Sequence, residues 1–173
     1  RLEDISSDYE FKLCRLDVAV KKVVKKFAPQ FIGRHISLHI EQIEDSVCTD
    51  SKWLGFIIEQ LISNAVKYSK DGGSVRIYTL HGKGDIKKNS KDDSLQLVIE
   101  DTGIGINEED IPRIMERGFT GYNGRLDRKS SGIGLYLCRK AADRLGFVIT
   151  FDASYKNGTR VVIDMTQRYT KHE

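Results

Sequence analysis

One segment of the 173-residue chain combines side chains that suit magnesium and phosphate. Between Asp50 and Tyr68, the side chains of Gln60, Asn64 and Lys67 fall on one narrow stripe of a 3.6-residue period, beside an apolar flank. The amide oxygen of an asparagine is a hard ligand for Mg²⁺, and a lysine one turn away suits phosphate. An ordinary amphipathic helix with a wet polar face would show the same spacing.

A second segment, Asp101-Thr102-Gly103-Ile104-Gly105, directly follows a predicted strand. A carboxylate at the end of a strand can accept hydrogen bonds from an exocyclic amine, and glycines let the backbone approach a planar ligand closely. The segment is not the GxGxxG pattern of a dinucleotide-binding fold, and the chain has no GxxxxGK[ST] phosphate loop. A plain Asp-Gly turn is the alternative.

A third segment, Ser130-Ser131-Gly132-Ile133-Gly134-Leu135, is a glycine-rich turn that opens a predicted helix. Backbone N–H groups at the N-terminus of a helix form a ready site for anions. A flexible entry into the helix would explain the glycines equally well. The order and separation of the three segments are therefore more specific than any one of them.

Hydrophobic periodicity predicts the elements that must position these segments. A helix capped by Asp50 runs to about Tyr68, a strand over 95–99 leads to Asp101, and a helix over 135–145 ends at Gly146. The other predicted elements are strands at 11–16, 36–40, 75–80, 147–153 and 159–164, a helix capped by Asp17 that ends or kinks at Pro29 and Gly33, and a short helix over 108–116 capped by Asn107. The order is mixed α and β, without an internal repeat.

The composition favours one soluble domain in a reducing compartment. An apolar fraction of 39% is too high for a disordered chain, no apolar run is long enough to cross a membrane, and the charged start does not resemble a signal peptide. With 28 basic and 25 acidic residues, the charge is too balanced to indicate nucleic-acid binding. The three cysteines are widely spaced and lack a CxxC pattern, which argues against a disulfide framework or a zinc site.

Two polar groups in the first 40 residues have ordinary explanations. Four lysines fall opposite the apolar stripe of the first helix, so we expect a solvated face, although such a face could also contact a membrane or nucleic acid: Lys21, Lys22, Lys25 and Lys26. His35 and His39 share one face of a strand without an acidic or cysteine partner at ligand spacing. We expect them to be surface histidines.

Together, the three segments resemble the motifs of the Bergerat ATP-binding fold, whose superfamily includes sensor histidine kinases, Hsp90, DNA gyrase B and MutL. EQLISNAVKYS resembles the histidine-kinase N box, DTGIG the G1 box, the region around Phe119 the F box, and SSGIGLYL the G2 box. RGFTGYNGR and GIGLYLCRKAADRLG look most like the intramembrane-sensing kinases of Gram-positive bacteria that detect antimicrobial peptides such as bacitracin. The resemblance covers about Phe11 to Asp164. It implies an α+β two-layer sandwich, with a mixed sheet covered on one face by about three helices and a mobile ATP lid.

The resemblance also implies roles for individual residues. Asn64 would hold Mg²⁺ between the ATP phosphates with support from Gln60, and Lys67 would contact phosphate, so these three are the expected catalytic residues. Asp101 would accept a hydrogen from the adenine amine, and Tyr68 would pack against the base. The full set expected to bind the nucleotide is Asn64, Lys67, Tyr68, Asp101, Gly103, Gly105, Ile106, Phe119, Ser131, Gly132, Ile133, Gly134 and Leu135.

By the same resemblance, residues 117–131 would form the ATP lid, anchored by Phe119. Three cations of this segment could reach the γ-phosphate or could be solvated loop charges: Arg125, Arg128 and Lys129. A stretch of this length without hydrophobic period is usually functional or mobile.

Gln60 separates two kinds of chemistry. The ATPases of the superfamily carry a glutamate at this place as the general base for water, whereas an amide cannot take up a proton. Glu59 is adjacent, but its side chain points about 100° around the helix from Gln60. We therefore expect phosphoryl transfer rather than fast hydrolysis.

The resemblance implies a protein-histidine kinase that uses ATP and Mg²⁺ and phosphorylates a histidine on a preceding dimerisation domain. None of the four histidines here has the H-[DE]-x-x-x-P context of a phosphoacceptor. We therefore expect residues 1–10 to be a remnant of that domain and residues 11–173 to be the catalytic and ATP-binding domain. The implied partners are the dimerisation domain, a response regulator and an ABC transporter, with no nucleic acid. The implied location is the cytoplasmic side of a membrane protein.

Two other functions remain open at this stage. A non-catalytic nucleotide-sensing module could use closure of the lid to regulate a partner, and a serine/threonine kinase such as an anti-sigma factor shares the same superfamily. Labelling of a histidine on an added dimerisation hairpin would separate the kinase from the sensing module.

Overall fold

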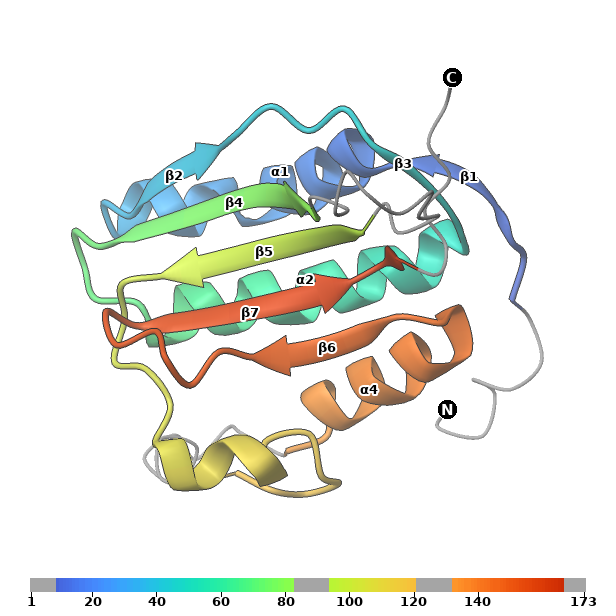
Figure 1. Ribbon diagram of the computed structural model, residues 1–173. Coiled ribbons are helices and arrows are strands. Elements are labelled where there is room, and N and C mark those ends of the chain that lie inside the picture. Colours follow the sequence, from blue (N-terminus) through green and yellow to red (C-terminus); the bar gives the residue numbers. More distant parts are fainter. Residues whose placement is uncertain (1–8, 83–93, 121–131, 167–173) are drawn as a thin grey trace.

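The computed structural model describes residues 9–82, 94–120 and 132–166, which form two layers (Figure 1). The elements in chain order are β1 (Lys12–Arg15), α1 (Leu16–Gly33), β2 (Ser37–Ile40), β3 (Ser46–Thr49), α2 (Ser51–Tyr68), β4 (Ser74–His81), β5 (Leu95–Asp101), the 3₁₀ helix η2 (Glu108–Arg113), α4 (Gly134–Leu145), β6 (Val148–Phe151) and β7 (Thr159–Asp164).

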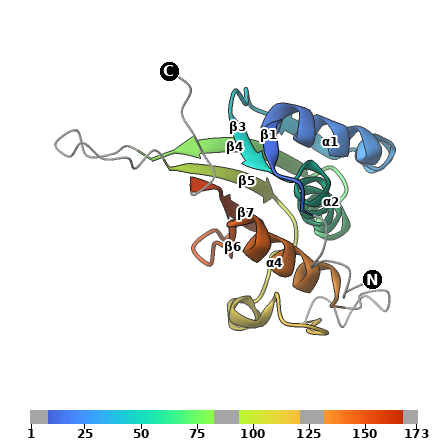
Figure 2. The same cartoon turned by 90° about the vertical axis from the view of Figure 1, so that its right-hand side faces the viewer.

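Five strands form one sheet in the order β2, β4, β5, β7, β6. Strand β2 runs parallel to β4, and the other neighbours are antiparallel. Helices α1, α2 and α4 cover one face of this sheet, as the side view makes clear (Figure 2). Strands β1 and β3 pair separately in a two-stranded sheet. The predicted α+β sandwich with helices on one face is confirmed.

The hydrophobic core lies between the three helices and the sheet. Seven residues of α2 are buried in it: Leu54, Ile57, Ile58, Leu61, Ile62, Ala65 and Val66. On β5 the alternate residues Leu95, Leu97 and Ile99 belong to the same core, and the alternation continues to Asp101. The two periodic patterns therefore bring the polar stripe of α2 and the Asp101 carboxylate to one edge of the core.

Asp50 caps α2 as predicted, and it also binds the segment that precedes β1. Its Oδ1 accepts a hydrogen bond from the backbone N–H of Trp53 at 2.9 Å, and its Oδ2 accepts one from the N–H of Glu10 at 2.7 Å. The ring of Tyr9 stacks on that of Trp53 at 5.6 Å. The N-terminus of the central helix and the first described residues are thus held together by one buried carboxylate.

The start of α1 differs from the prediction. The helix begins at Leu16, and Arg15 occupies the N-cap position without a side-chain capping bond. Asp17, the predicted cap, lies in the first turn and pairs with Arg15 at 2.7 Å. A negative charge in the first turn still stabilises the helix through the helix dipole, so Asp17 marks the start of the helix without capping it. The helix continues through Pro29 and ends at Gly33.

Two further elements were predicted wrongly or missed. The short helix predicted over 108–116 is a six-residue 3₁₀ helix that ends at Arg113, and the predicted cap Asn107 makes no side-chain capping bond there. Pro112 lies inside it and lacks the N–H that a longer helix would need. Strand β3 was not predicted, because its sequence has only a weak alternation and the strand depends on antiparallel pairing with β1.

The surface of α1 agrees with the sequence. All four lysines opposite the apolar stripe are exposed, and His35 and His39 are exposed as well. Within residues 9–82, 94–120 and 132–166, no helix has both the length and the apolar character needed to span a bilayer.

We expect Asp50→Ala to lower the free energy of unfolding by about 1–2 kcal/mol, because it removes an N-cap acceptor and leaves two partly buried N–H groups without one. Asp50→Asn keeps a cap oxygen and should lose less. Chemical denaturation followed by circular dichroism measures both. Equal losses in the two variants would show that the charge matters and the cap oxygen does not.

Candidate nucleotide-binding site

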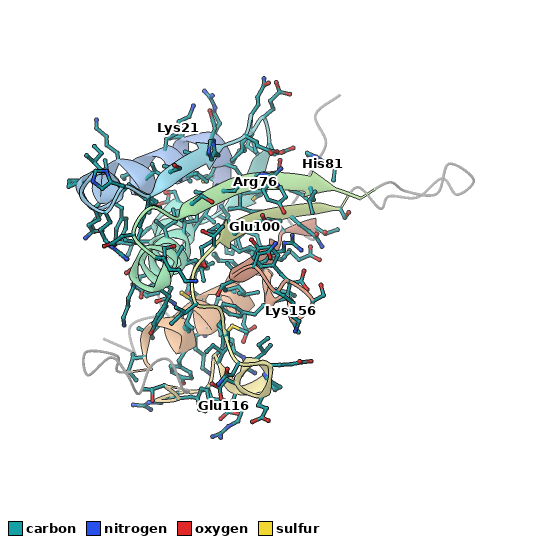
Figure 3. All side chains as sticks on the ribbon, turned by 90° about the vertical axis from the view of Figure 1, so that its left-hand side faces the viewer. Lys21, Arg76, His81, Glu100, Glu116 and Lys156 are labelled. Atoms are coloured by element: carbon teal, nitrogen blue, oxygen red, sulfur yellow. The ribbon has the colours of Figure 1, made fainter. Side chains whose placement is uncertain are left out.

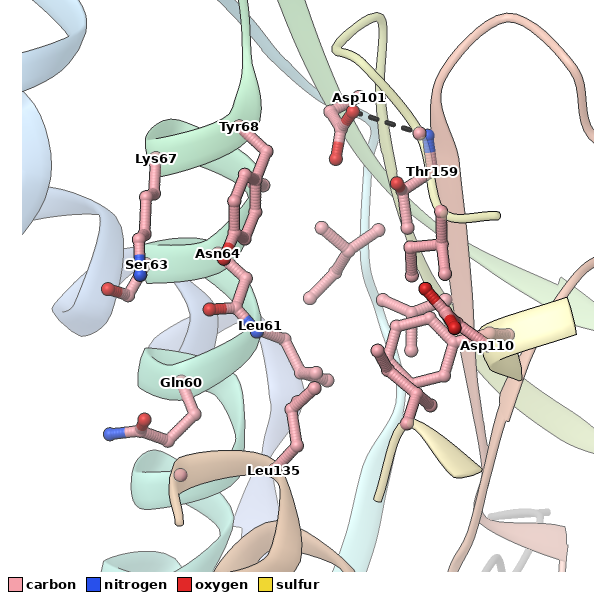
Figure 4. Close-up of a pocket in the computed structure, with 18 of the residues that line it drawn as sticks. Gln60, Leu61, Ser63, Asn64, Lys67, Tyr68, Asp101, Asp110, Leu135 and Thr159 are labelled. Atoms are coloured by element: carbon pink, nitrogen blue, oxygen red, sulfur yellow. Dashed lines mark hydrogen bonds between the residues drawn. The ribbon is translucent and has the colours of Figure 1, made fainter. Parts of the chain in front are cut away.

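A cavity of about 230 Å³ opens beside α2 at the edge of the core (Figure 4). One wall is α2, a second lies where β5 ends and β7 begins, and a third combines the segment after Gly105 with the start of α4. The described residues that line it are Gln60, Leu61, Ser63, Asn64, Ala65, Lys67, Tyr68, Ile99, Asp101, Gly105, Ile106, Asp110, Ile114, Phe119, Thr120, Gly132, Gly134, Leu135, Phe151, Thr159 and Val161.

The cavity gathers most of the residues that the sequence singled out. Those that line it are Gln60, Asn64, Lys67, Tyr68, Asp101, Gly105, Ile106, Phe119, Gly132, Gly134 and Leu135. Gly103 and Ile133 are not among the lining residues. Ser131 and the lid cations Arg125, Arg128 and Lys129 lie outside the described residues.

Asp101 is the buried carboxylate of the site, with 5% of the residue exposed. Its Oδ1 accepts hydrogen bonds from the backbone N–H groups of Gly103 at 2.8 Å and Thr159 at 3.2 Å. Burial raises the pKa of Asp101 to about 6, although both N–H groups act to lower it. In Figure 4 the other oxygen points toward the cavity, where it can accept a hydrogen from a bound amine.

The backbone packs around Asp101 so closely that two neighbours must be glycine. A Cβ on Gly103 would lie 2.2 Å from the carbonyl oxygen of Tyr68, and one on Gly158 would lie 2.0 Å from the carbonyl oxygen of Asp101. Gly158 also has a φ of 154°, which side-chain-bearing residues rarely adopt. Gly103 does not line the cavity, but its N–H group orients the Asp101 carboxylate.

Helix α2 contributes the polar wall. Gln60, Asn64 and Lys67 lie one turn apart along it, and the ring of Tyr68 also lines the cavity (Figure 4). The Lys67 ammonium lies 5.2 Å from the centre of the Tyr68 ring. The carbonyl oxygen of Tyr68 accepts a hydrogen bond from the N–H of Ile104 at 3.1 Å. This bond ties the end of α2 to the loop that follows Asp101.

The start of α4 closes the cavity on the side of Gln60. The side-chain oxygen of Gln60 lies so close to Gly134 that a Cβ there would be only 2.5 Å from it. The first N–H groups of α4 have no partner within the helix, and its positive end favours anions. Any side chain at position 134 would separate the amide of Gln60 from this helix end.

Two segments far apart in sequence meet beside the helix start. The N–H of Gly118 donates to the carbonyl oxygen of Gly132 at 3.1 Å. Gly132 has a φ of 69°, and a Cβ on it would lie within 2.8 Å of the Phe119 backbone. The guanidinium of Arg113 stacks on the Phe119 ring at 4.6 Å. Phe119 is thus held at the cavity wall.

Several lining residues could not be found from the sequence. Thr159 and Val161 face the cavity because β7 pairs with β5 so that Thr159 lies opposite Asp101 and Val161 opposite Ile99. That register is a long-range property with no local signal. Asp110 and Ile114 come from the segment predicted as a short helix, which the structure forms as a 3₁₀ helix ending at Arg113.

The comparisons with known proteins agree with this geometry. Residues 49–168 match the family model described as histidine kinase-, DNA gyrase B-, and HSP90-like ATPase. The chain is 35% identical to the sensor protein BceS of Bacillus subtilis (strain 168) over 159 residues, which cover 92% of this chain and 45% of BceS. It is 38% identical to the sensor protein kinase GraS of Staphylococcus aureus (strain JH1) over 120 residues, 69% of this chain and 32% of GraS.

Solved structures show the same fold. The mycobacterial sensor histidine kinase MprB superposes with a TM-score of 0.72 at 22% identity, covering 93% of this chain and 100% of that one. The catalytic domain of the histidine kinase ThkA gives 0.71 at 20% identity, covering 93% and 99%. At these identities the likeness supports the fold alone.

The chain belongs to the histidine kinase-, DNA gyrase B- and HSP90-like ATPase family. Within this family it is a histidine-kinase ATP-binding catalytic domain, related to the sensor proteins BceS, YxdK and GraS. The non-catalytic sensing module is not favoured, because YxdK and GraS are named as kinases. The chain spans less than half the length of BceS and YxdK and about a third of GraS.

Because burial raises the pKa of Asp101 from 3.8 to about 6, the folded protein holds this proton more tightly than the unfolded chain. Ionisation of Asp101 therefore lowers the free energy of unfolding. The loss grows as the pH rises from about 4 to about 6 and stays constant at higher pH. We expect Asp101→Asn to be more stable than the wild type at pH 8 by at most about 3 kcal/mol, with the difference vanishing below pH 4.

Chemical denaturation of both proteins at about pH 4 and pH 8 measures the effect. The matched control is Asp71→Asn, an exposed carboxylate paired with Arg34. A stability difference for Asp101→Asn that does not grow between the two pH values would contradict the assignment of a raised pKa.

Proposed function

We propose that the cavity binds ATP with Mg²⁺ and that this domain transfers the γ-phosphoryl group to a histidine on a dimerisation domain of the same protein. The phosphoryl group would then pass to a response regulator. The observation that carries the proposal is that Asp101 and the stripe of Asn64 and Lys67 line opposite sides of one cavity (Figure 4). The purine would lie at the end of the cavity near Asp101, and the phosphates would lie at the end near Asn64 and Lys67.

At the purine end, the free oxygen of Asp101 accepts a hydrogen from the 6-amino group of adenine. Ile106 and Phe151 offer apolar surface to the base, and the ring of Tyr68 offers a face for stacking. Because Oδ1 of Asp101 is already bonded to two N–H groups, the carboxylate does not need to reorient when the nucleotide arrives. This preorganisation supports selectivity for adenine.

At the phosphate end, Lys67 provides a positive charge and the first N–H groups of α4 provide neutral donors. Gly134 leaves room for phosphate oxygens beside these donors. Gln60 lies between this helix end and Asn64, where its amide can hold a phosphate oxygen or orient Asn64. The phosphates are thus bound by groups from two separate helices.

The donor set of the cavity fits Mg²⁺ bound through the nucleotide. In the part of the chain that the structure describes, no group of three or more His, Cys, Asp or Glu residues could hold a metal by itself. The protein would supply the amide oxygen of Asn64, and phosphate oxygens and water would complete the octahedral coordination that Mg²⁺ requires. Bound there, Mg²⁺ offsets negative charge on the phosphate oxygens during transfer.

The residues around the phosphate end do not favour hydrolysis. Gln60 cannot take up a proton from water. Glu59 pairs with Lys26 of α1 at 2.5 Å and is not among the residues that line the cavity. Without a carboxylate on the α2 stripe to activate water, the phosphoryl group is best transferred to a nucleophile that another domain brings, such as a histidine nitrogen.

The likeness to BceS and GraS supports three wider parts of the proposal. The whole protein would be a membrane sensor with this domain on the cytoplasmic side. Its partners would be its own dimerisation domain and a response regulator. An ABC transporter is a further candidate partner in the response to antimicrobial peptides.

Calorimetric titration with a non-hydrolysable ATP analogue tests the binding site. We expect Asp101→Asn to weaken binding by about 10- to 100-fold, because it loses a charge-assisted hydrogen bond to the amine. We expect Asn64→Ala to weaken binding chiefly when Mg²⁺ is present. Glu59→Gln, one residue from Gln60 and outside the cavity, is the matched control and should bind as the wild type does. Unchanged binding in Asp101→Asn would refute the purine end of the site.

Incubation of the full-length protein with γ-labelled ATP tests the transfer. We expect an acid-labile label on the wild type and none on the Asn64→Ala variant. The 173-residue chain should bind ATP without labelling itself and should release little free phosphate. Rapid release of phosphate by this chain would overturn the argument from Gln60 and Glu59.

A further inference from the structure

The face of the sheet opposite the three helices carries a cluster of charged and aromatic side chains that the cavity does not use. Arg160 of β7 is at its centre. Its Nε donates to Oε1 of Glu100 at 2.7 Å, one Nη donates to Oδ2 of Asp152 at 3.0 Å, and its guanidinium stacks on the ring of Tyr155 at 4.3 Å. We call Arg160, Glu100, Asp152 and Tyr155 the Arg160 cluster. Figure 3 labels Glu100, which comes from β5.

The Arg160 cluster lies directly behind Asp101. In the register of β5 and β7, Glu100 pairs with Arg160 and the next pair is Asp101 with Thr159. Because side chains alternate along a strand, the first pair faces away from the cavity and the second pair faces it. The ion pair therefore fixes the strands next to the point where the N–H of Thr159 donates to Oδ1 of Asp101.

A second connection runs through the loop between β6 and β7. The hydroxyl of Tyr155 donates to the carbonyl oxygen of Asp101 at 3.3 Å, and the N–H of Asp152 donates to the carbonyl oxygen of Arg160 at 2.9 Å. Arg160 contacts the side chains of both loop residues. Two described residues of this part of the chain hydrogen-bond to Asp101, namely Thr159 and Tyr155. Thr159 directly precedes Arg160, and the ring of Tyr155 packs against the Arg160 side chain.

The cluster includes a charge that would be costly without its partners. The side chain of Glu100 is 9% exposed, and it also accepts a hydrogen bond from the hydroxyl of Tyr78 and lies 3.9 Å from Arg76. Loss of Arg160 would leave this carboxylate without its nearest cation, so β5 and β7 would relax to rehydrate it. Asp101 follows Glu100 directly, so this relaxation would move the purine acceptor.

We propose that Arg160 is a positioning residue for purine recognition: it holds Asp101 in the orientation that accepts the 6-amino group, and so sets the preference for adenine over purines that lack this group. The inference rests on the proposed function of the cavity. It assigns specificity to a side chain on the opposite face of the sheet, which does not touch the nucleotide.

The test compares calorimetric affinities for ATP and for the triphosphate of purine riboside, which lacks only the 6-amino group. We expect the wild type to prefer ATP on the order of 10- to 100-fold. Arg160→Met keeps the apolar stem and should reduce this preference about five- to tenfold. Arg160→Lys keeps the charge but cannot contact both carboxylates with a planar fork, so its preference should be intermediate.

The affinity ratio separates positioning from stability, because a general loss of stability weakens both ligands equally. Val162→Ala is the matched control: Val162 is the next residue of β7 on the same face, pairs with Val98, and is two residues from Arg160. Its preference should equal that of the wild type. If Arg160→Met does not fold by circular dichroism, Asp152→Asn removes one partner of Arg160 at the surface and should show a smaller fall.

An unchanged preference in a folded Arg160→Met protein, or in Asp152→Asn where the first does not fold, would overturn the inference. An equal fall in Val162→Ala would also overturn it, since sheet packing alone would then explain the effect. If the wild type itself binds both triphosphates equally, Asp101 does not accept the amine, and the proposed purine site fails together with this inference. That last outcome is seen in the wild type alone, so the two failures are distinguishable.

Discussion

The site depends on the cost of keeping the Asp101 carboxylate away from water. A buried charge is tolerated only where donors replace the lost hydration, and two backbone N–H groups do this for one oxygen of Asp101. These donors come from separate segments, at Gly103 and Thr159, so both segments must approach the end of β5 closely. The approach excludes side chains at Gly103 and Gly158. The raised pKa of Asp101 shows that the compensation is incomplete.

Helix α2 connects this constraint with the rest of the fold. One side of the helix contributes seven residues to the core, and the adjoining stripe contributes Gln60, Asn64 and Lys67 to the cavity wall. Its N-terminus is fixed by Asp50, and the carbonyl oxygen of Tyr68 near its C-terminus is bonded to Ile104. The distance between Asp101 and the polar stripe of α2 is therefore set by the packing of a rigid helix on a sheet. Sites built on such elements are more accurately positioned than sites built on loops.

Local patterns predicted those parts of the fold that depend on local physics. The sequence correctly predicted the period and cap of α2, the left-handed glycine that ends α4, and the alternation on β5. Long-range strand pairing could not be predicted from the sequence. Thr159 lines the cavity because of the register between β5 and β7, and β3 forms by pairing with β1. Around Asp110 the acidic residues after Asn107 correctly predicted a short helix, but its predicted length and cap were wrong, because Pro112 lacks the N–H that a longer helix needs.

The hydrogen bond between Gly118 and Gly132 has a consequence for how this family of sequences can vary. The two glycines meet in space, so the chain between them leaves and returns at the same point of the cavity wall. For such a closed loop, each doubling of length costs only about 0.6 kcal/mol of closure entropy. Insertions or deletions between Thr120 and Gly132 should therefore leave the wall formed by Phe119 and Gly134 in place. The contact between the two glycines therefore lets the length of the chain after Thr120 change with little effect on the free energy of unfolding.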